Sequence, residues 1–136
     1  MPTRKVPKDE LQLLRTIMNH VSDAVVACDK NGTLTYFNKA TTRLHGIPEA
    51  ALPPERWAEH YDLYKADGVT RLKKNEVPLF RALSGETVQD EEIVIAPKKA
   101  NPHRLLCDGC LLYDEHGKPA GAYVIMREVP FDPSKS

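Results

Sequence analysis

The chain has 136 residues and a net charge of zero, with 19 Lys and Arg residues against 19 Asp and Glu residues. This length supports one compact domain and leaves no room for a second, catalytic one. Balanced charge provides no long-range positive field, so the composition predicts neither nucleic acid nor an anionic membrane surface as a partner.

The sequence also bears on where in the cell the protein is located, because it shows neither a membrane-spanning run nor a signal peptide. No apolar run approaches the ~20 residues that cross a bilayer, and the basic leader of residues 1–8 precedes no signal-type apolar stretch. The chain is therefore predicted to be cytoplasmic. Its three cysteines, Cys28, Cys107 and Cys110, are an odd number in a protein of cytosolic character, and we expect free thiols.

An amphipathic helix is predicted over residues 9–21, because apolar side chains recur there at three- and four-residue spacing. Two interpretations stay open. The apolar stripe packs on its own domain, or it pairs with the stripe of a second copy across a two-fold axis. In the second case the homodimer interface consists of Leu11, Leu14, Met18 and Val21.

A β-hairpin is predicted next. Residues 24–29 are small and β-branched, and residues 33–37 resume the apolar pattern after an interruption. Between them lie Asn31 and Gly32, and Asn-Gly readily adopts the left-handed conformations of a tight hairpin turn.

Three short helices follow the hairpin. Asn38 is a suitable N-cap for residues 39–45, and Gly46 a suitable C-cap. Residues 55–64 are predicted to form one or two helical turns, and residues 78–84 a helix with proline in its first turn. The second helix places three aromatic side chains on one face: Trp57, Tyr61 and Tyr64.

Three strands complete the domain, at residues 87–95, 104–113 and 120–129. A turn at residues 114–117 joins the last two, and residues 130–136 form a short polar tail. Two strands, then short helices, then a meander of three strands is the order of an α+β domain with an antiparallel sheet.

These segments resemble a PAS domain, of the variety found in bacterial sensor kinases and regulatory phosphatases. The resemblance spans residues 22–129 and is carried by four runs: residues 22–38, 67–70, 76–86 and 117–122. It implies a five-stranded antiparallel sheet with short helices on one face, an N-terminal amphipathic helix outside it, and an enclosed cavity. It further implies a protein that senses or dimerises and is not a catalyst.

The resemblance also implies which side chains face the cavity. From the strands these are Val26, Cys28, Leu105, Cys107, Ala122, Val124 and Met126, and from the helices Trp57, Tyr61, Tyr64 and Leu83. A wall of this composition suits a small apolar or amphipathic organic ligand better than a charged one. The same side chains would also serve simply to fill a core, and the sequence leaves both interpretations open.

No cofactor is predicted. Flavin photoreceptors of this family carry an Asn-Cys-Arg run that this sequence lacks, which argues against flavin adduct chemistry. A haem would need His60, with His45 behind it, but the acidic neighbours of His60 indicate a surface residue. A metal site at His103, Cys107 and Cys110 is not expected, because the two cysteines point to opposite faces of a strand.

Catalytic patterns are also missing from the sequence: we find no nucleophile beside a base and no glycine-rich phosphate loop. The sequence therefore predicts a sensory signalling module rather than an enzyme. It would bind a small organic ligand and signal through the packing of a dimer or of an output domain such as a histidine kinase or phosphatase. The alternative is a ligand-free module for dimerisation or protein interaction.

Overall fold

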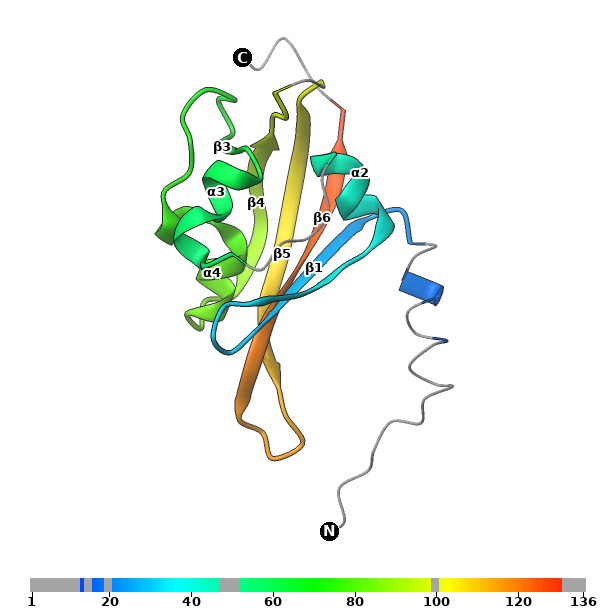
Figure 1. Cartoon of the computed structure of the whole chain (residues 1–136), viewed down its shortest axis with the longest axis vertical. Helices are drawn as coiled ribbons and strands as arrows, with labels where there is room; N and C mark the ends of the chain where they lie inside the picture. The colour runs from blue at the N-terminus through cyan, green and yellow to red at the C-terminus, as the bar shows by residue number, and fades with distance from the viewer. Residues whose placement is uncertain (1–12, 14–15, 19–20, 47–51, 99–100, 131–136) are drawn as a thin grey trace.

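The computed structural model describes residues 13, 16–18, 21–46, 52–98 and 101–130. Within them one antiparallel sheet has the strand order β2-β1-β6-β5-β4-β3, and short helices pack against its inner face (Figure 1). The elements are β1 (Ala24–Asp29), β2 (Leu34–Phe37), α2 (Lys39–His45), η1 (Pro54–Arg56), α3 (Trp57–His60), β3 (Leu63–Lys65), η2 (Lys74–Glu76), α4 (Pro78–Leu83), β4 (Val88–Ile95), β5 (His103–Tyr113) and β6 (Pro119–Val129). The α+β class with an antiparallel sheet is confirmed.

The sheet has six strands where five were expected, because the segment of residues 55–64 does not remain helical. Asp62 adopts φ +54°, a left-handed conformation that ends the helical run two residues after α3. The chain then turns back along β4, and Tyr64 pairs with Val94. Tyr64 therefore lies on the edge strand β3, and its predicted place on a helix was wrong.

The predicted β1–β2 hairpin is confirmed. Gly32 takes φ +81°, and the Asp29 carboxylate accepts hydrogen bonds from the backbone N–H groups of Asn31 and Thr33 at 2.9 and 3.0 Å. A Cβ added to Gly32 would lie 2.7 Å from Cγ of Pro54. The tip of the hairpin therefore lies against Pro54, the first residue of η1.

Asn38 joins three parts of the chain through its fully buried side chain. As N-cap of α2 its Oδ1 accepts a hydrogen bond from the backbone N–H of Thr41 at 3.1 Å, and the Thr41 hydroxyl, whose one proton is shared between Oδ1 and the Val25 carbonyl, lies 2.8 Å from Oδ1. The same oxygen accepts the Val25 N–H at 3.0 Å. Its Nδ2 donates to the carbonyls of Asp23 at 2.8 Å and Met18 at 3.2 Å. One amide therefore connects α2, β1 and the N-terminal segment.

Most of the helix predicted over residues 9–21 lies outside the described residues, which do include a helical stretch at residues 16–18. There Met18 and, beyond it, Val21 are half-buried, whereas Ile17 is 49% exposed. Also outside the description are the leader, the tail beyond Pro130, and the predicted interface residues Leu11 and Leu14. The homodimer interface stays a prediction.

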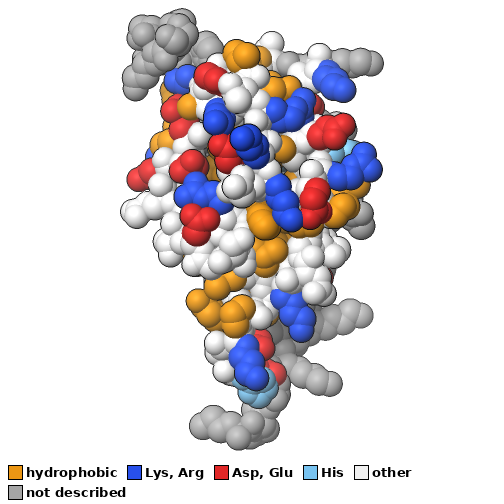
Figure 2. All heavy atoms as spheres, turned by 90° about the vertical axis from the view of Figure 1, so that its left-hand side faces the viewer, with side chains coloured by type: hydrophobic (Ala, Val, Ile, Leu, Met, Phe, Trp, Pro, Cys, Tyr) orange, Lys and Arg blue, Asp and Glu red, His pale blue; other side chains and the backbone are white. Residues whose placement is uncertain are grey.

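Charged side chains of both signs are interspersed over the molecular face of Figure 2, on the side of α3 and α4. Several are paired across elements, such as Lys74 with Glu55 at 2.6 Å and Arg81 with Glu91 at 3.0 Å. Exposed pairs of this kind contribute little to stability. We therefore attribute the fold to its apolar core and to the buried hydrogen bonds of Asn38.

Replacing Asn38 with Ala is expected to lower the free energy of unfolding by about 2–3 kcal/mol, because the cap of α2 is lost and buried backbone groups lose their partner. Asn75→Ala is the matched control, since Asn75 is exposed on η2 and its loss should change stability by less than about 0.5 kcal/mol. Urea unfolding of both variants measures this. Equal stability of the two variants would contradict the role assigned to Asn38.

Candidate functional site

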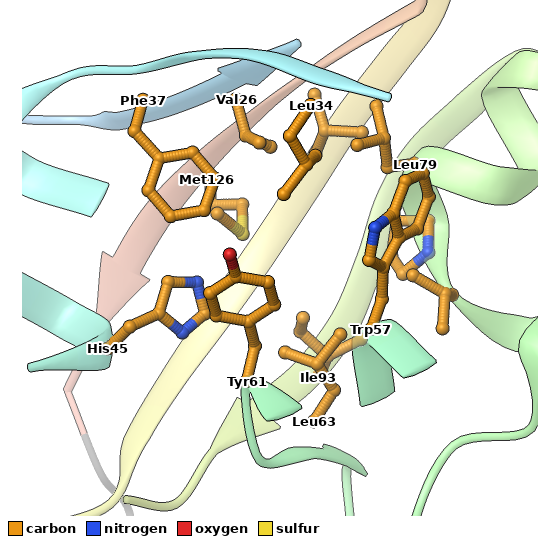
Figure 3. Close-up of a pocket in the computed structure, with 13 residues that line it drawn as sticks. Val26, Leu34, Phe37, His45, Trp57, Tyr61, Leu63, Leu79, Ile93 and Met126 are labelled. Atoms are coloured by element: carbon orange, nitrogen blue, oxygen red, sulfur yellow. The ribbon is translucent and has the colours of Figure 1, made fainter. Parts of the chain in front are cut away.

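A cavity of about 50 Å³ lies between the inner face of the sheet and the short helices (Figure 3). Its wall is mostly apolar and carries no charged side chain among the described residues. The lining residues are Val26, Leu34, Phe37, His45, Trp57, Tyr61, Leu63, Val77, Pro78, Leu79, Ile93, Val124 and Met126. Strands β1, β2, β3, β4 and β6 and helices α2, α3 and α4 all contribute to this wall.

The structure brings five of the eleven sequence-predicted residues to the cavity: Val26, Trp57, Tyr61, Val124 and Met126. Four others are core residues that are at most 2% exposed and lie outside the lining: Cys28, Leu105, Cys107 and Ala122. Leu83 packs half-buried against the core, and the hydroxyl of Tyr64 accepts a hydrogen bond from Arg71 at 2.9 Å. Ligand binding by any of them stays a prediction.

Eight of the thirteen lining residues were not predicted as ligand-binding from the sequence: Leu34, Phe37, His45, Leu63, Val77, Pro78, Leu79 and Ile93. Ile93 alternates with Ile95 on β4, and this pattern could have revealed it. Leu34 and Phe37 on β2 are three residues apart, and a register irregularity in the hairpin hides them from simple alternation. His45 falls on the buried face of α2, whose buried positions 40, 41, 44 and 45 have helical spacing. That spacing was a usable signal.

His45 is the unusual member of the wall, because it is a polar side chain that is only 8% exposed. Its ring centroid lies 5.8 Å from that of Phe37 and 4.8 Å from that of Tyr61, and the three rings form an aromatic cluster at one side of the cavity (Figure 3). Trp57 faces this cluster from the other side. Burial lowers the pKa of His45 to about 4, so the imidazole is neutral at physiological pH.

Polar atoms at the cavity belong to His45, Trp57 and Tyr61. The indole N–H of Trp57 donates to the Leu52 carbonyl at 3.2 Å, and is therefore satisfied within the protein. The Nδ1 atom of His45 has no hydrogen-bond partner among the described residues. The wall thus offers apolar contact almost everywhere, and the buried Nδ1 of His45 is an unpaired polar atom in it among the described residues.

The size of the cavity limits what it holds without rearrangement. One water needs roughly 10–15 Å³ of such space, whereas pockets for drug-sized ligands have roughly 300–1,000 Å³. A volume of about 50 Å³ corresponds to a guest of few atoms. A haem or a flavin would require large displacements of the wall, and His60, the residue considered for haem, is exposed outside the lining.

The cysteines are arranged as structural thiols. Burial raises the pKa of Cys28 to about 11 and that of Cys107 to about 12, so both stay protonated and unreactive. Cys110 is half-buried and its thiol donates to the Tyr123 hydroxyl at 3.3 Å. Within the described part of the chain, no three His, Cys, Asp or Glu residues are grouped to hold a metal ion.

Comparison with known proteins identifies the family. A family profile described as PAS fold matches residues 18–130. Hybrid signal transduction histidine kinase I of Dictyostelium discoideum is 31% identical over 93 residues, which cover 66% of this chain and 5% of that protein. The chain belongs to the PAS fold family.

Solved structures support the same fold. The PAS domain of an HTR-like protein from Haloarcula marismortui has a TM-score of 0.61 at 13% identity, covering 90% of this chain and 100% of that one. The PAS domain of nitrogen regulation protein NR(II) from Vibrio parahaemolyticus has a TM-score of 0.57 at 17% identity, covering 86% and 98%. In the described residues, none of the helices has the length and apolar character needed to cross a membrane.

The buried His45 predicts a pH dependence of stability. Its pKa in the folded state, about 4, lies below the ordinary value of 6.5, so between these values the unfolded chain binds the proton and the folded domain does not. The free energy of unfolding should therefore fall as the pH drops from 6.5 towards 4, by up to about 3 kcal/mol. Urea unfolding at a series of pH values measures the fall.

His45→Phe should remove most of this fall, because phenylalanine keeps a ring in the cluster and has no proton to bind. His60→Phe is the matched control, since it alters the neighbouring exposed imidazole and leaves His45 in place. An unchanged pH profile in His45→Phe would show that the acid sensitivity arises elsewhere.

Proposed function

We propose that this domain is the sensory input module of a larger histidine-kinase-type signalling protein, and that a small, largely apolar molecule in the cavity is its signal. The observation that carries the proposal is the apolar cavity at the junction of the sheet with α2, α3 and α4. A largely apolar space, with no charged side chain among the described residues that line it, suits binding of an apolar guest rather than catalysis.

The kinase context is supported by the relative from Dictyostelium discoideum, which is named as a histidine kinase. The aligned region is 5% of that protein, as expected for one module among several. The proposed output is therefore a kinase or another effector domain, reached through the N-terminal segment and through pairing with a second copy. The proposed location is the cytoplasm.

A short chain of contacts leads from the cavity to the N-terminal segment. Val26 lines the cavity, and the backbone of its neighbour Val25 bonds through N–H to Asn38 and through its carbonyl to the Thr41 hydroxyl at 2.9 Å. Asn38 in turn donates to the Met18 carbonyl at the end of the helical residues. A guest that displaces β1 would bias the position of that helix, to the extent that it binds the two arrangements differently.

The second candidate function is a ligand-free interaction module. The small size of the cavity favours it, because about 50 Å³ is little more than a packing defect in a core of this extent. In this case the protein's own side chains fill the pocket, and the domain functions only by binding a second copy or another protein at its surface.

Two valines on β1 separate these candidates. Val26 and Val25 are both 8% exposed, but they point to opposite faces of the strand and only Val26 lines the cavity. Val26→Ile adds one methylene to the cavity, which should raise the free energy of unfolding by up to about 0.8 kcal/mol and weaken binding of any guest. Val25→Ile is the control, and should leave guest binding unchanged.

Native mass spectrometry of the purified chain tests whether a small molecule is bound. The sensor proposal expects a protein-bound mass that organic solvent removes, or a rise in melting temperature with a panel of small metabolites. It expects Val26→Ile, and not Val25→Ile, to reduce that occupancy. A bare mass together with no stabilising compound in the panel would refute the sensor and leave the interaction module.

A further inference from the structure

The proposed ligand site has one polar feature that its apolar wall does not explain. His45 is more than nine-tenths buried, lines the cavity, and its Nδ1 atom lacks a hydrogen-bond partner among the described residues. An unpaired buried polar atom destabilises the folded state, so a core selected only for packing would place an apolar side chain here. The aromatic contacts with Phe37 and Tyr61 would be equally available to a phenylalanine. The imidazole also bonds to the Tyr61 backbone, and this accounts for one ring nitrogen but not for Nδ1.

From this we infer that the imidazole of His45 is the polar anchor of the cavity, and that its ligand is a small aliphatic molecule carrying a hydroxyl group. This inference rests on the proposed function, since it specifies the guest of the same cavity. A hydroxyl group both donates and accepts, and therefore pairs with an imidazole nitrogen in either tautomer of the neutral ring. The apolar remainder of the wall contacts the hydrocarbon part of the guest.

The wall argues against two other classes of guest. A buried water makes about three hydrogen bonds, whereas polar side-chain atoms among the described lining residues belong to His45, Trp57 and Tyr61 alone. Of these, the Trp57 indole N–H is already bonded to the Leu52 carbonyl. A carboxylate or ammonium group would be desolvated beside a wall that has no charged side chain among the described residues, at a cost that one neutral imidazole does not offset. The volume of about 50 Å³ restricts the hydrocarbon part to a few carbon atoms.

The test compares three probes of similar size: xenon, propane and propan-2-ol. Xenon and propane report whether the cavity admits an apolar guest, and propan-2-ol adds the hydroxyl group. Binding is followed by NMR of the backbone amides, and the imidazole nitrogens of His45 are followed directly in the unaltered protein. Propan-2-ol is expected to shift these nitrogens, and xenon and propane are expected to leave their hydrogen bonding unchanged.

Two substitutions of His45 measure how much its imidazole contributes to binding of the probes. His45→Leu keeps a side chain of similar size without a polar atom, and should weaken propan-2-ol binding about five- to tenfold while changing propane binding less than twofold. His45→Asn retains a hydrogen-bonding group near the position of Nδ1, and should recover part of the loss. Amide spectra establish that each variant is folded, and the nitrogen shifts of the unaltered protein decide the question if either is not.

The possible failures are distinguishable. If the probes bind but propan-2-ol leaves the His45 nitrogens unmoved, or if His45→Leu weakens propane and propan-2-ol equally, the anchor is refuted and the apolar ligand site stands. If neither xenon nor propane nor propan-2-ol enters the cavity, the ligand site is refuted together with its anchor.

Discussion

The buried amide of Asn38 is the constraint on which the arrangement of the site depends. Its oxygen caps α2 and accepts the Val25 N–H, and its nitrogen binds the carbonyls of Asp23 and Met18. A fully buried amide that satisfies this many backbone groups fixes the angle at which α2 leaves the β1–β2 hairpin. His45 lies at the end of that helix, so its place in the cavity wall follows from a cap seven residues earlier.

The cavity is a consequence of covering a curved sheet with very short helices. Helix α3 has four residues and α4 has six, too few to fill the inner face between β1 and β4. The left-handed Asp62 then diverts the chain into β3, which brings Leu63 into the wall in place of another helical turn. At roughly 24 cal/mol per Å³, an empty volume of about 50 Å³ costs the domain about 1 kcal/mol. A domain of this size tolerates such a cost.

The sequence was sufficient for elements with strong local signals. The Asn-Gly turn, the Asn38 cap and the Gly46 terminus locate the hairpin and the helix over residues 39–45, and alternation locates the three long strands within about one residue of their bounds. The sequence was not sufficient where the conformation of one residue redirects the backbone, as the left-handed Asp62 does before β3. Alternation also identifies the face on which Leu105 and Val124 both lie, but not where helices leave space on it, so only Val124 reaches the cavity. That distinction depends on tertiary packing.

The small size of the cavity also limits how a signal could operate. The best small ligands gain roughly 1.5 kcal/mol per heavy atom, so a guest of about four such atoms supplies at most about 6 kcal/mol. Driving a two-state equilibrium from 1:99 to 99:1 requires about 5.5 kcal/mol of difference in binding, which is nearly all of that energy. The proposed sensor therefore works only if its two arrangements already differ by a few kcal/mol or less. A single hydrogen-bonded link from β1 through Asn38 to Met18 has an energy in that range, because each of its bonds contributes only about 1 kcal/mol.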